Sequence, residues 1–347
     1  MFGRYYTLSV IVFIAASMGA AAQLSFSPAR SEELRTAAIV PPTASVLRPP
    51  AGLIDVLRAN NEVRVVVPTA TGPITLVGKP FDLFTADAVM MKRGSEGDEL
   101  VELPRHALMG GYVEGHPGSS VFFAAFETHV IAMIEFREPE GKRRFLISPD
   151  TVVPGTMAIH VYHESRAGEG SPKDCHAETL PNYQQQVDSI FQLVRNLDSR
   201  SKQDGDRGQD ATPYALQFAL DCTLSFYTNL GSNLTTAASS AIAIAGAAAV
   251  VYQRDANVIL RVPYLRVWTV TDPYPGEIGS KLGKIREHWE ANMTHVRRSI
   301  TCLLSGEGGG GLAWVGVLCG GYGYNVSGVD GRVNFPASGY VWDIDVT

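Results

Sequence analysis

Between residues 62 and 148, short runs of apolar or alternating apolar and polar residues follow one another, separated by glycine, proline and charged positions. Runs of this length predict β-strands, because successive side chains of a strand point to opposite faces of a sheet. The short separations favour an antiparallel meander, since tight turns can join antiparallel neighbours. We expect strands at residues 62–67, 74–77, 120–126, 130–136 and 144–148.

The pattern changes over residues 182–200, where apolar side chains recur every three or four positions, as on one face of a helix. These side chains are Val187, Ile190, Phe191, Val194 and Leu197. A stretch at residues 199–210 mixes charged residues with glycine and glutamine and has little apolar surface to bury. We therefore expect a helix followed by a linker that proteases can reach, at a domain boundary.

From residue 213 onward, strand-like and helix-like segments alternate. The apolar patterns predict strands at 214–220, 258–264 and 312–318, a long helix at 235–252, and one or two helices within 281–304. Alternation of this kind is typical of a largely parallel sheet. The chain is therefore predicted to be α+β overall, with a β-rich region followed by an α/β domain whose sheet is mostly parallel.

Composition adds two constraints. With 347 residues, of which 45% are hydrophobic and 18% charged, the chain can bury a core and has the length of about two domains. The net charge is -6 and no long cluster of lysine and arginine occurs, which argues against a nucleic-acid partner because phosphate neutralisation needs a basic face.

The N-terminus has the layout of a secretory signal peptide. Arg4 precedes an apolar run at residues 8–16, and small residues follow at 20–22, so we expect residues 1–22 to be removed and the protein to be secreted. A membrane anchor is the alternative, but the run is shorter than the ~20 apolar residues that a spanning helix needs. Residues 237–251 are also apolar, yet they are alanine-rich and short, which favours a buried helix and no stable membrane span.

Candidate chemistry is sparse. The four cysteines contain no C-x-x-C pair, and their pairing cannot be deduced from spacing. His160 and His163 are expected on opposite faces of a strand, and His288 and His295 lie seven positions apart with no carboxylate to complete a ligand set. The glycine run at 308–311 lacks the Lys-Ser/Thr of a phosphate loop and is predicted to be a loop. No catalytic or metal-ligating residue is predicted.

Four segments, in order, resemble the reprolysin (adamalysin) group of metzincin zinc endopeptidases. Residues 310–319 (GGLAWVGVLC) are similar to the edge of that family's catalytic sheet, and residues 258–268 to its second strand. Residues 111–120 (GYVEGHPGSS) are similar to its prodomain, and residues 172–175 (PKDC) to its Pro-Lys-x-Cys inhibitory switch. The resemblance implies a prodomain-like region at 23–181 and a partial metzincin-like α/β catalytic domain at 212–347. Together with the signal peptide at 1–22 and the helix and polar linker at 182–211, these are the predicted domains.

In this family the edge strand holds an extended peptide or protein substrate by main-chain pairing, which implies substrate binding at Gly311, Leu312, Ala313 and Trp314. The resemblance also implies that the Cys175 thiolate occupies the catalytic zinc as an inhibitory switch, although His176 stands where the family has glycine. A plain linker cysteine or half of a disulfide remains an equal alternative for Cys175.

Zinc is implied by the resemblance alone, since no His-Glu-x-x-His occurs before Thr347 and no zinc ligands are present in the chain. We therefore expect a precursor that is truncated before its zinc helix and does not hydrolyse peptides. A non-catalytic secreted binding or inhibitory protein is the alternative, in which Cys175 reaches the zinc of a related protease in trans. A third interpretation is a segment that does not fold stably alone, because its sheet lacks a covering element.

Overall fold

A computed structural model of the chain describes residues 22–28, 45–69, 72–138, 141–149, 157–163, 213–307, 310–314, 317–318 and 321–329. Two compact units divide the chain: Met1–Phe81 with His106–Val161, and Asp82–Arg105 with Tyr162–Thr347. Residues 82–105 therefore belong to the second unit, although the predicted domain ranges include them in the region 23–181. Cys175, the predicted helix and linker at 182–211, and the predicted signal peptide apart from Ala22 lie outside the described residues.

A sheet of ten strands forms the first unit, in the order β1-β4-β5-β8-β9-β10-β11-β12-β3-β2. The strands are β1 (Ala22–Ser25), β2 (Ser27–Pro28), β3 (Ser45–Arg48), β4 (Val63–Thr69), β5 (Gly72–Phe81), β8 (His106–Val113), β9 (His116–Phe126), β10 (Val130–Glu138), β11 (Gly141–Pro149) and β12 (Met157–His163). Antiparallel pairing of β4, β5, β8, β9, β10 and β11 confirms the predicted meander, and β1 adds a parallel strand beside β4.

Strand periodicity explains the core of the first unit. In β4, Val63, Val65 and Val67 are buried while the residues between them are partly exposed, as expected when one face of a sheet covers a core. Helix α2 (Leu53–Ala59) packs against β8 and β9 and contributes Leu57, which is fully buried. Close contact of β5 with β8 requires Gly111, because a Cβ there would lie 2.0 Å from the carbonyl oxygen of Val77.

Seven strands form the sheet of the second unit, in the order β16-β17-β15-β13-β14-β6-β7. They are β6 (Phe84–Gly94), β7 (Gly97–Val101), β13 (Tyr214–Cys222), β14 (Val258–Trp268), β15 (Ile300–Ser305), β16 (Gly310–Ala313) and β17 (Tyr324–Gly328). The pairs from β17 to β6 are parallel, whereas β16 and β7 are antiparallel at the two edges. The sheet is thus mixed, and the predicted parallel pairing holds for its interior but not for its two edges.

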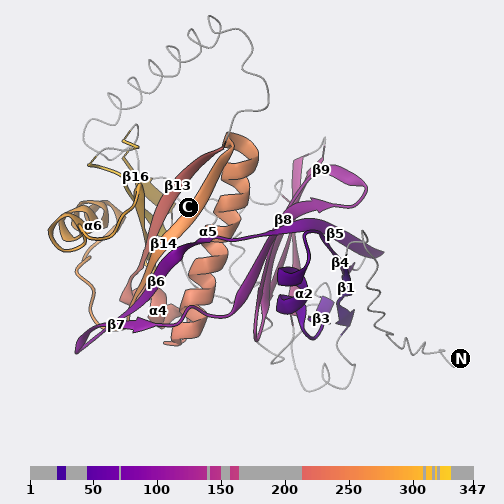
Figure 1. Ribbon diagram of the computed structural model, residues 1–347, viewed down its shortest axis with the longest axis horizontal. Helices are drawn as coiled ribbons and strands as arrows, with labels where there is room; N and C mark the ends of the chain where they lie inside the picture. Colours follow the sequence, from indigo (N-terminus) through magenta and orange to yellow (C-terminus); the bar gives the residue numbers. More distant parts are fainter. Residues whose placement is uncertain are drawn as a thin grey trace, which may run out of the picture. The chain divides into compact units, whose positions relative to one another are not determined.

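Two long helices cover this sheet on opposite sides (Figure 1). The chain moves from β13 to β14 through α5 and then back past β13 to β15 through α6, so the two connections cross the sheet in opposite directions. Because both crossovers are right-handed, their helices lie on opposite faces of the sheet. Helix α5 (Leu234–Ala256) packs against β14, and its buried alanines allow a close approach. It is long and apolar enough to cross a membrane, but 67% of its most apolar window is buried in the fold. Helix α6 (Ile278–Asn292) packs against β16 and β17.

The structure corrects two of the element predictions in this unit. Helix α6 ends at Asn292, and the last part of the predicted helix 281–304 is the central strand β15. Continuous burial of β15 explains the error, because a short run that is apolar on both faces cannot be told from a buried helix by its period. The predicted strand 312–318 is β16, which begins within the glycine run at Gly310 and ends at Ala313.

Candidate functional site

Strand β16 forms one edge of the second unit's sheet. It pairs with β17 in antiparallel register, with Gly311 opposite Ser327 and Leu312 opposite Val326. Among the strands that the structure describes, it has a neighbour on one side only. Of the residues predicted to bind substrate, Gly311, Leu312 and Ala313 therefore lie together on an edge strand, and Trp314 follows directly.

Hydrogen bonds between β15 and the ends of β17 show how the main chain of β17 is oriented. The Val329 N–H donates to the Ser305 carbonyl at 2.7 Å. At the other end, the Gly323 carbonyl accepts from the Thr301 N–H at 2.9 Å. Main-chain groups alternate in direction along a strand, so the odd-numbered residues of β17 face β15 and the even-numbered residues face β16.

This alternation determines which groups of β16 face the open edge. Leu312 lies directly opposite Val326, an even-numbered residue of β17, so the main-chain groups of Leu312 and Gly310 are directed toward β17. The N–H and carbonyl groups of Gly311 and Ala313 must then point away from the sheet. Two donors and two acceptors are therefore directed to the side of β16 opposite β17, where the described residues between 22 and 329 place no strand.

Side chains along β16 alternate between core and surface. Leu312 is 4% exposed and belongs to the apolar cluster beneath α6, whereas the Ala313 side chain is exposed. Trp314 packs partly against the same cluster, and its ring meets those of Tyr322 and Tyr324 edge-on at 5.2 and 6.5 Å. The core thus fixes β16 from below, and an aromatic group marks its end.

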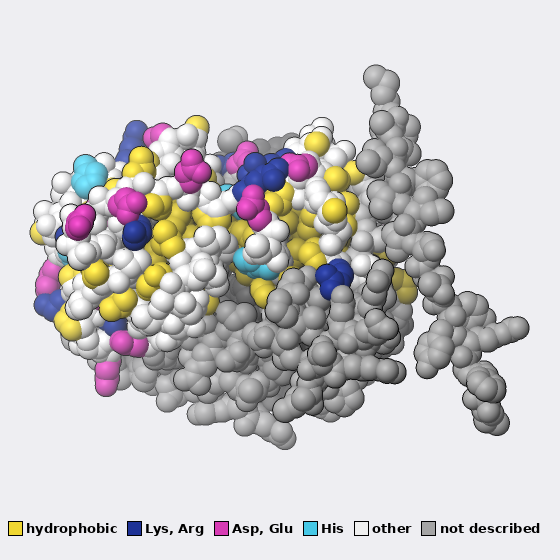
Figure 2. Space-filling view, turned by 90° about the horizontal axis from the view of Figure 1, so that it is seen from below, with side chains coloured by type: hydrophobic (Ala, Val, Ile, Leu, Met, Phe, Trp, Pro, Cys, Tyr) yellow, Lys and Arg dark blue, Asp and Glu magenta, His cyan; other side chains and the backbone are white. Residues whose placement is uncertain are grey.

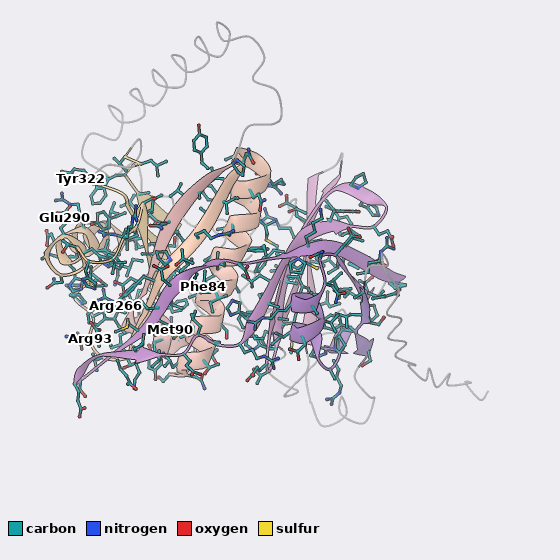
Figure 3. All side chains as sticks on the ribbon, in the orientation of Figure 1. Phe84, Met90, Arg93, Arg266, Glu290 and Tyr322 are labelled. Atoms are coloured by element: carbon teal, nitrogen blue, oxygen red, sulfur yellow. The ribbon has the colours of Figure 1, made fainter. Side chains whose placement is uncertain are left out.

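A cation lies over this aromatic group. The Arg286 guanidinium of α6 is 4.5 Å from the centre of the Tyr322 ring and 5.8 Å from that of Trp314. Its Nη1 lies 3.7 Å from the Glu290 carboxylate one turn further along the helix. Tyr322 is 46% exposed, and Figure 3 shows it near Glu290 at the α6 end of the unit. This group, Arg286, Glu290, Trp314 and Tyr322, is called the aromatic rim below.

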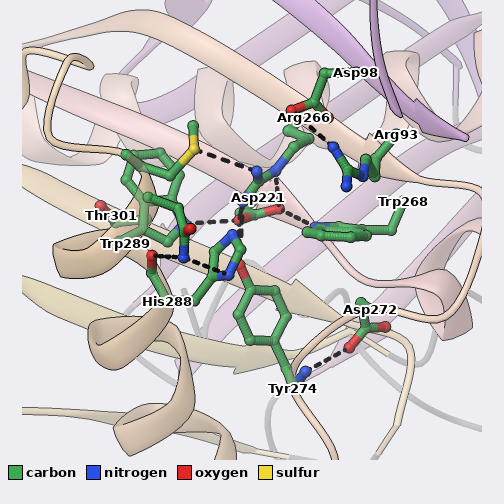
Figure 4. Close-up of polar contacts among 12 residues, drawn as sticks. Arg93, Asp98, Asp221, Arg266, Trp268, Asp272, Tyr274, His288, Trp289 and Thr301 are labelled. Carbon is green, nitrogen blue, oxygen red and sulfur yellow. Dashed lines mark hydrogen bonds and ion pairs between the residues drawn. The ribbon is translucent and has the colours of Figure 1, made fainter. Parts of the chain in front are cut away.

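Beneath α6, a buried carboxylate joins three separate segments of the second unit (Figure 4). Asp221 at the end of β13 is fully buried and accepts hydrogen bonds from Arg266, at 2.5 and 3.2 Å. The indole N–H groups of Trp268 and Trp289 donate to it at 2.8 and 2.7 Å, and the Tyr274 hydroxyl donates at 2.7 Å. We call these five residues the Asp221 network.

Charges and hydrogen bonds within the Asp221 network determine which of its groups are ionised. Burial by itself raises the pKa of Asp221, but the charge of Arg266 and the hydrogen bonds from Arg266, Tyr274 and Trp289 outweigh it, and the pKa is lowered. Burial and the Asp221 charge raise the pKa of Tyr274 well above its ordinary value. A carboxylate that already accepts five hydrogen bonds has no lone pair left for a substrate proton, so the network is structural. It fixes α6, through Trp289, over the sheet.

The cysteines of the described residues are unsuited to nucleophilic chemistry. Cys222 and Cys302 are both buried and free. Burial raises the pKa of Cys302 to about 12, and burial together with the nearby Asp221 raises that of Cys222. Both thiols therefore stay protonated and unreactive at neutral pH. The predicted switch residue Cys175 lies outside the described residues.

The described part of the chain does not provide a zinc site. It holds no group of three or more His, Cys, Asp or Glu side chains that could share a metal ion. His288 on α6 packs edge-on against Trp268 and Tyr274 at 5.8 and 5.6 Å, and burial lowers its pKa. Within the described residues no ligand set is available for the metal that the family resemblance implies, and no chemical step is assigned to a metal.

Neither the aromatic rim nor the Asp221 network was predicted from the sequence. The sequence did indicate that Asp221 needs a partner, because a charged residue inside the apolar run of a buried strand must be paired. The same holds for Arg266, which lies in the apolar run of β14. Arg286 and Tyr322 lie 36 positions apart with no pattern that connects them, so only the fold could bring them together.

Comparisons with known proteins add little. No protein-family model matches the chain, and no curated protein matches it. Among solved structures, metalloproteinase-II from Bacteroides fragilis is similar with 11% sequence identity and a TM-score of 0.38, over 79% of this chain and 78% of that chain. A likeness at this level carries no argument about function.

Proposed function

We propose that the second unit binds an extended peptide along β16, and that the chain belongs to the precursor of a secreted, reprolysin-like zinc endopeptidase. The observation that carries the peptide-binding proposal is the outward direction of the main-chain groups of Gly311 and Ala313 at an edge of the sheet. An extended peptide can pair with two such residues and add one strand to the sheet. The family, export and Cys175 as an inhibitory switch rest on the sequence resemblance and the signal pattern.

The surroundings of β16 suit the approach of an extended peptide. Glycines at positions 310 and 311 carry no side chain that would keep another backbone away. The Tyr322 ring at the aromatic rim is partly exposed and gives an apolar surface against which a peptide side chain can pack. Main-chain pairing supplies affinity with little dependence on sequence, and the rim supplies a preference for one side chain.

Peptide binding at β16 requires no metal. Because the described residues provide no zinc site, we assign binding to this edge and hydrolysis to none of them. Binding along β16 is therefore compatible with a zinc endopeptidase whose ligands lie elsewhere and with a non-catalytic binding protein. The two differ in turnover, whereas both require the open edge.

A proline substitution at the edge tests the proposal. Ala313→Pro removes the outward N–H, while the ladder to β17 is kept because the hydrogen-bonding groups of position 313 face away from it. We measure binding of the full chain to immobilised unfolded β-casein by surface plasmon resonance. Loss of one hydrogen bond and the bulk of the ring are expected to weaken binding by about tenfold or more.

Ala313→Ser is the matched control, since it keeps the N–H and alters only an exposed side chain. Its affinity is expected to stay within about twofold of wild type, because isolated surface substitutions change free energies little. Equal binding of the proline and serine variants, or no binding by the wild type, would contradict peptide pairing at β16.

A further inference from the structure

A hairpin from the first part of the chain completes the sheet of the second unit. Strands β6 and β7 lie in sequence between β5 and β8, which pair with each other in the first unit. In space, β6 pairs in parallel with β14, and β7 is the antiparallel edge beyond it. Figure 1 shows these two strands, in indigo to purple, beside the orange strands of the second unit. The chain thus enters this sheet, leaves it, and returns to it more than 100 residues later.

Main-chain hydrogen bonds hold β6 to β14 near both ends. Before β6, the Leu83 carbonyl accepts from the Val262 N–H at 2.8 Å. Near its other end, the Arg93 carbonyl accepts from the N–H of Thr269 at 3.0 Å and from its hydroxyl at 2.9 Å. Between these bonds, the register runs residue by residue from Val89 to Arg93. The hairpin is therefore part of the sheet, through β6, and not a loop that rests against it.

Side chains of the hairpin add to the pairing. Leu83 and Met90 are 1% and 2% exposed, so the core of the second unit includes residues from the first part of the chain. The Arg93 guanidinium lies 5.8 Å from the Trp268 ring centre and 3.3 Å from Asp98 across the hairpin (Figures 3 and 4). Hairpin residues therefore touch the Asp221 network through Trp268.

Strand β14 depends on this neighbour. From Tyr264 to Trp268 every residue is buried, which is typical of an interior strand with partners on both sides. Without β6, one side of this run would become an unpaired apolar edge of the kind that promotes aggregation. Helix α5 covers a face of the sheet and cannot satisfy the main-chain groups along this side.

We propose that the hairpin β6–β7 keeps the first part of the chain, up to His163, bound non-covalently to the second unit even when the chain between them is cut. A cut anywhere between His163 and Pro213 would separate the first part from α4 (Leu224–Asn229), α5, α6 and their strands in sequence but not in space, because β6 stays paired with β14. If the first part is the prodomain proposed above, its release requires withdrawal of β6 as well as cleavage of the chain. Retention of the fragment requires neither zinc nor peptide binding at β16, so it can fail independently of the proposed function.

A site-specific cut tests this directly. A recognition sequence for a specific protease is inserted between Gly205 and Asp206 of the full chain, within the predicted polar linker. After complete cleavage, the two fragments are expected to elute together in size-exclusion chromatography under native conditions and to separate in denaturant. Separate elution in native buffer would overturn the proposal.

Matched proline variants show whether the hairpin is the link. The Arg93 carbonyl faces β14, so by alternation the N–H of Met91 also faces β14. Met91→Pro removes it and is expected to weaken association of the cut fragments by about 100-fold or more, as proline does inside a sheet. Leu100→Pro on β7 is the control: the flanking residues Glu99 and Val101 pair with β6, so the N–H of Leu100 faces away, and co-elution should be unchanged.

Hydrogen exchange on the cut wild-type protein gives a second readout that does not depend on the proline variant folding. Amides of residues 84–94 and 258–268 are expected to keep the protection that they have in the intact chain. Exchange of residues 84–94 at the rate of an unfolded segment would overturn the proposal. So would full co-elution of the Met91→Pro fragments, because another contact would then hold them together.

Discussion

Replacement of Asp221 by asparagine tests whether the Asp221 network determines the stability of the second unit. The substitution keeps the shape of the side chain and removes its charge, which leaves the 2%-exposed Arg266 without a counter-ion. It also brings an amide N–H₂ toward a position where Arg266, Tyr274 and Trp289 all donate. Removal of one partner from a buried ion pair costs about 3–5 kcal/mol, and we expect a loss of this size in the free energy of unfolding.

Tryptophan fluorescence during denaturant unfolding is the suitable assay. All four tryptophans lie between residues 268 and 342, so their fluorescence reports the second unit and not the first. Trp268 and Trp289 donate directly to Asp221, and their emission changes when the network opens. The midpoint of the transition, at unchanged slope, gives the difference in stability.

Asp255→Asn is the matched control, because it removes the same charge from an exposed pair with Arg254. Exposed pairs contribute about 0–1 kcal/mol, so this variant should unfold near the wild-type midpoint. Addition of Arg266→Met to Asp221→Asn removes the uncompensated cation and should restore part of the stability. An Asp221→Asn variant within about 1 kcal/mol of wild type would refute the structural role of the network.

Three further predictions concern other parts of the molecule. Burial lowers the pKa of His129 from 6.5 to about 4, so the unfolded state binds the proton more readily than the folded state. As the pH falls from about 6.5 to about 4, the free energy of unfolding should therefore fall by up to about 3 kcal/mol. In urea titrations, His129→Gln should remove this dependence on pH. Gly111→Ala should destabilise the first unit by about 1–3 kcal/mol, because its Cβ meets a main-chain carbonyl, whereas Gly118→Ala, with open space around it, should not lower the thermal midpoint. Cys222 and Cys302 should resist alkylation in native buffer and react fully in denaturant, as peptide mapping by mass spectrometry would show; rapid native labelling would contradict their burial.

Local patterns predicted the secondary structure of much of the chain, because those elements bury one face or one short run. The long helix expected at 235–252 is α5, and the strands expected at 214–220 and 258–264 are β13 and β14. Hairpin β6–β7 was missed. Its residues are mostly only partly buried, so they show no strong apolar pattern, and the segment lies far in sequence from the sheet that it joins.

The candidate site, too, was predicted from the sequence only in part. The family resemblance implied an edge strand with substrate binding at Gly311, Leu312, Ala313 and Trp314, and β16 (Gly310–Ala313) lies at an edge of the described sheet, while substrate binding there stays a prediction. The direction of their main-chain groups depends on the register with β17, which sequence alone does not supply. The aromatic rim joins α6 to the segment around Tyr322, and contacts of that kind exist only after folding.

Residue-resolved hydrogen exchange on the full chain, with and without unfolded β-casein, tests peptide pairing at β16 most directly. The amide of Leu312 faces β17 and should be protected in both states, whereas those of Gly311 and Ala313 should exchange freely alone and become protected when the peptide binds. No gain of protection at Gly311 and Ala313 under saturating β-casein would contradict the account, as would equal gains along the whole strand.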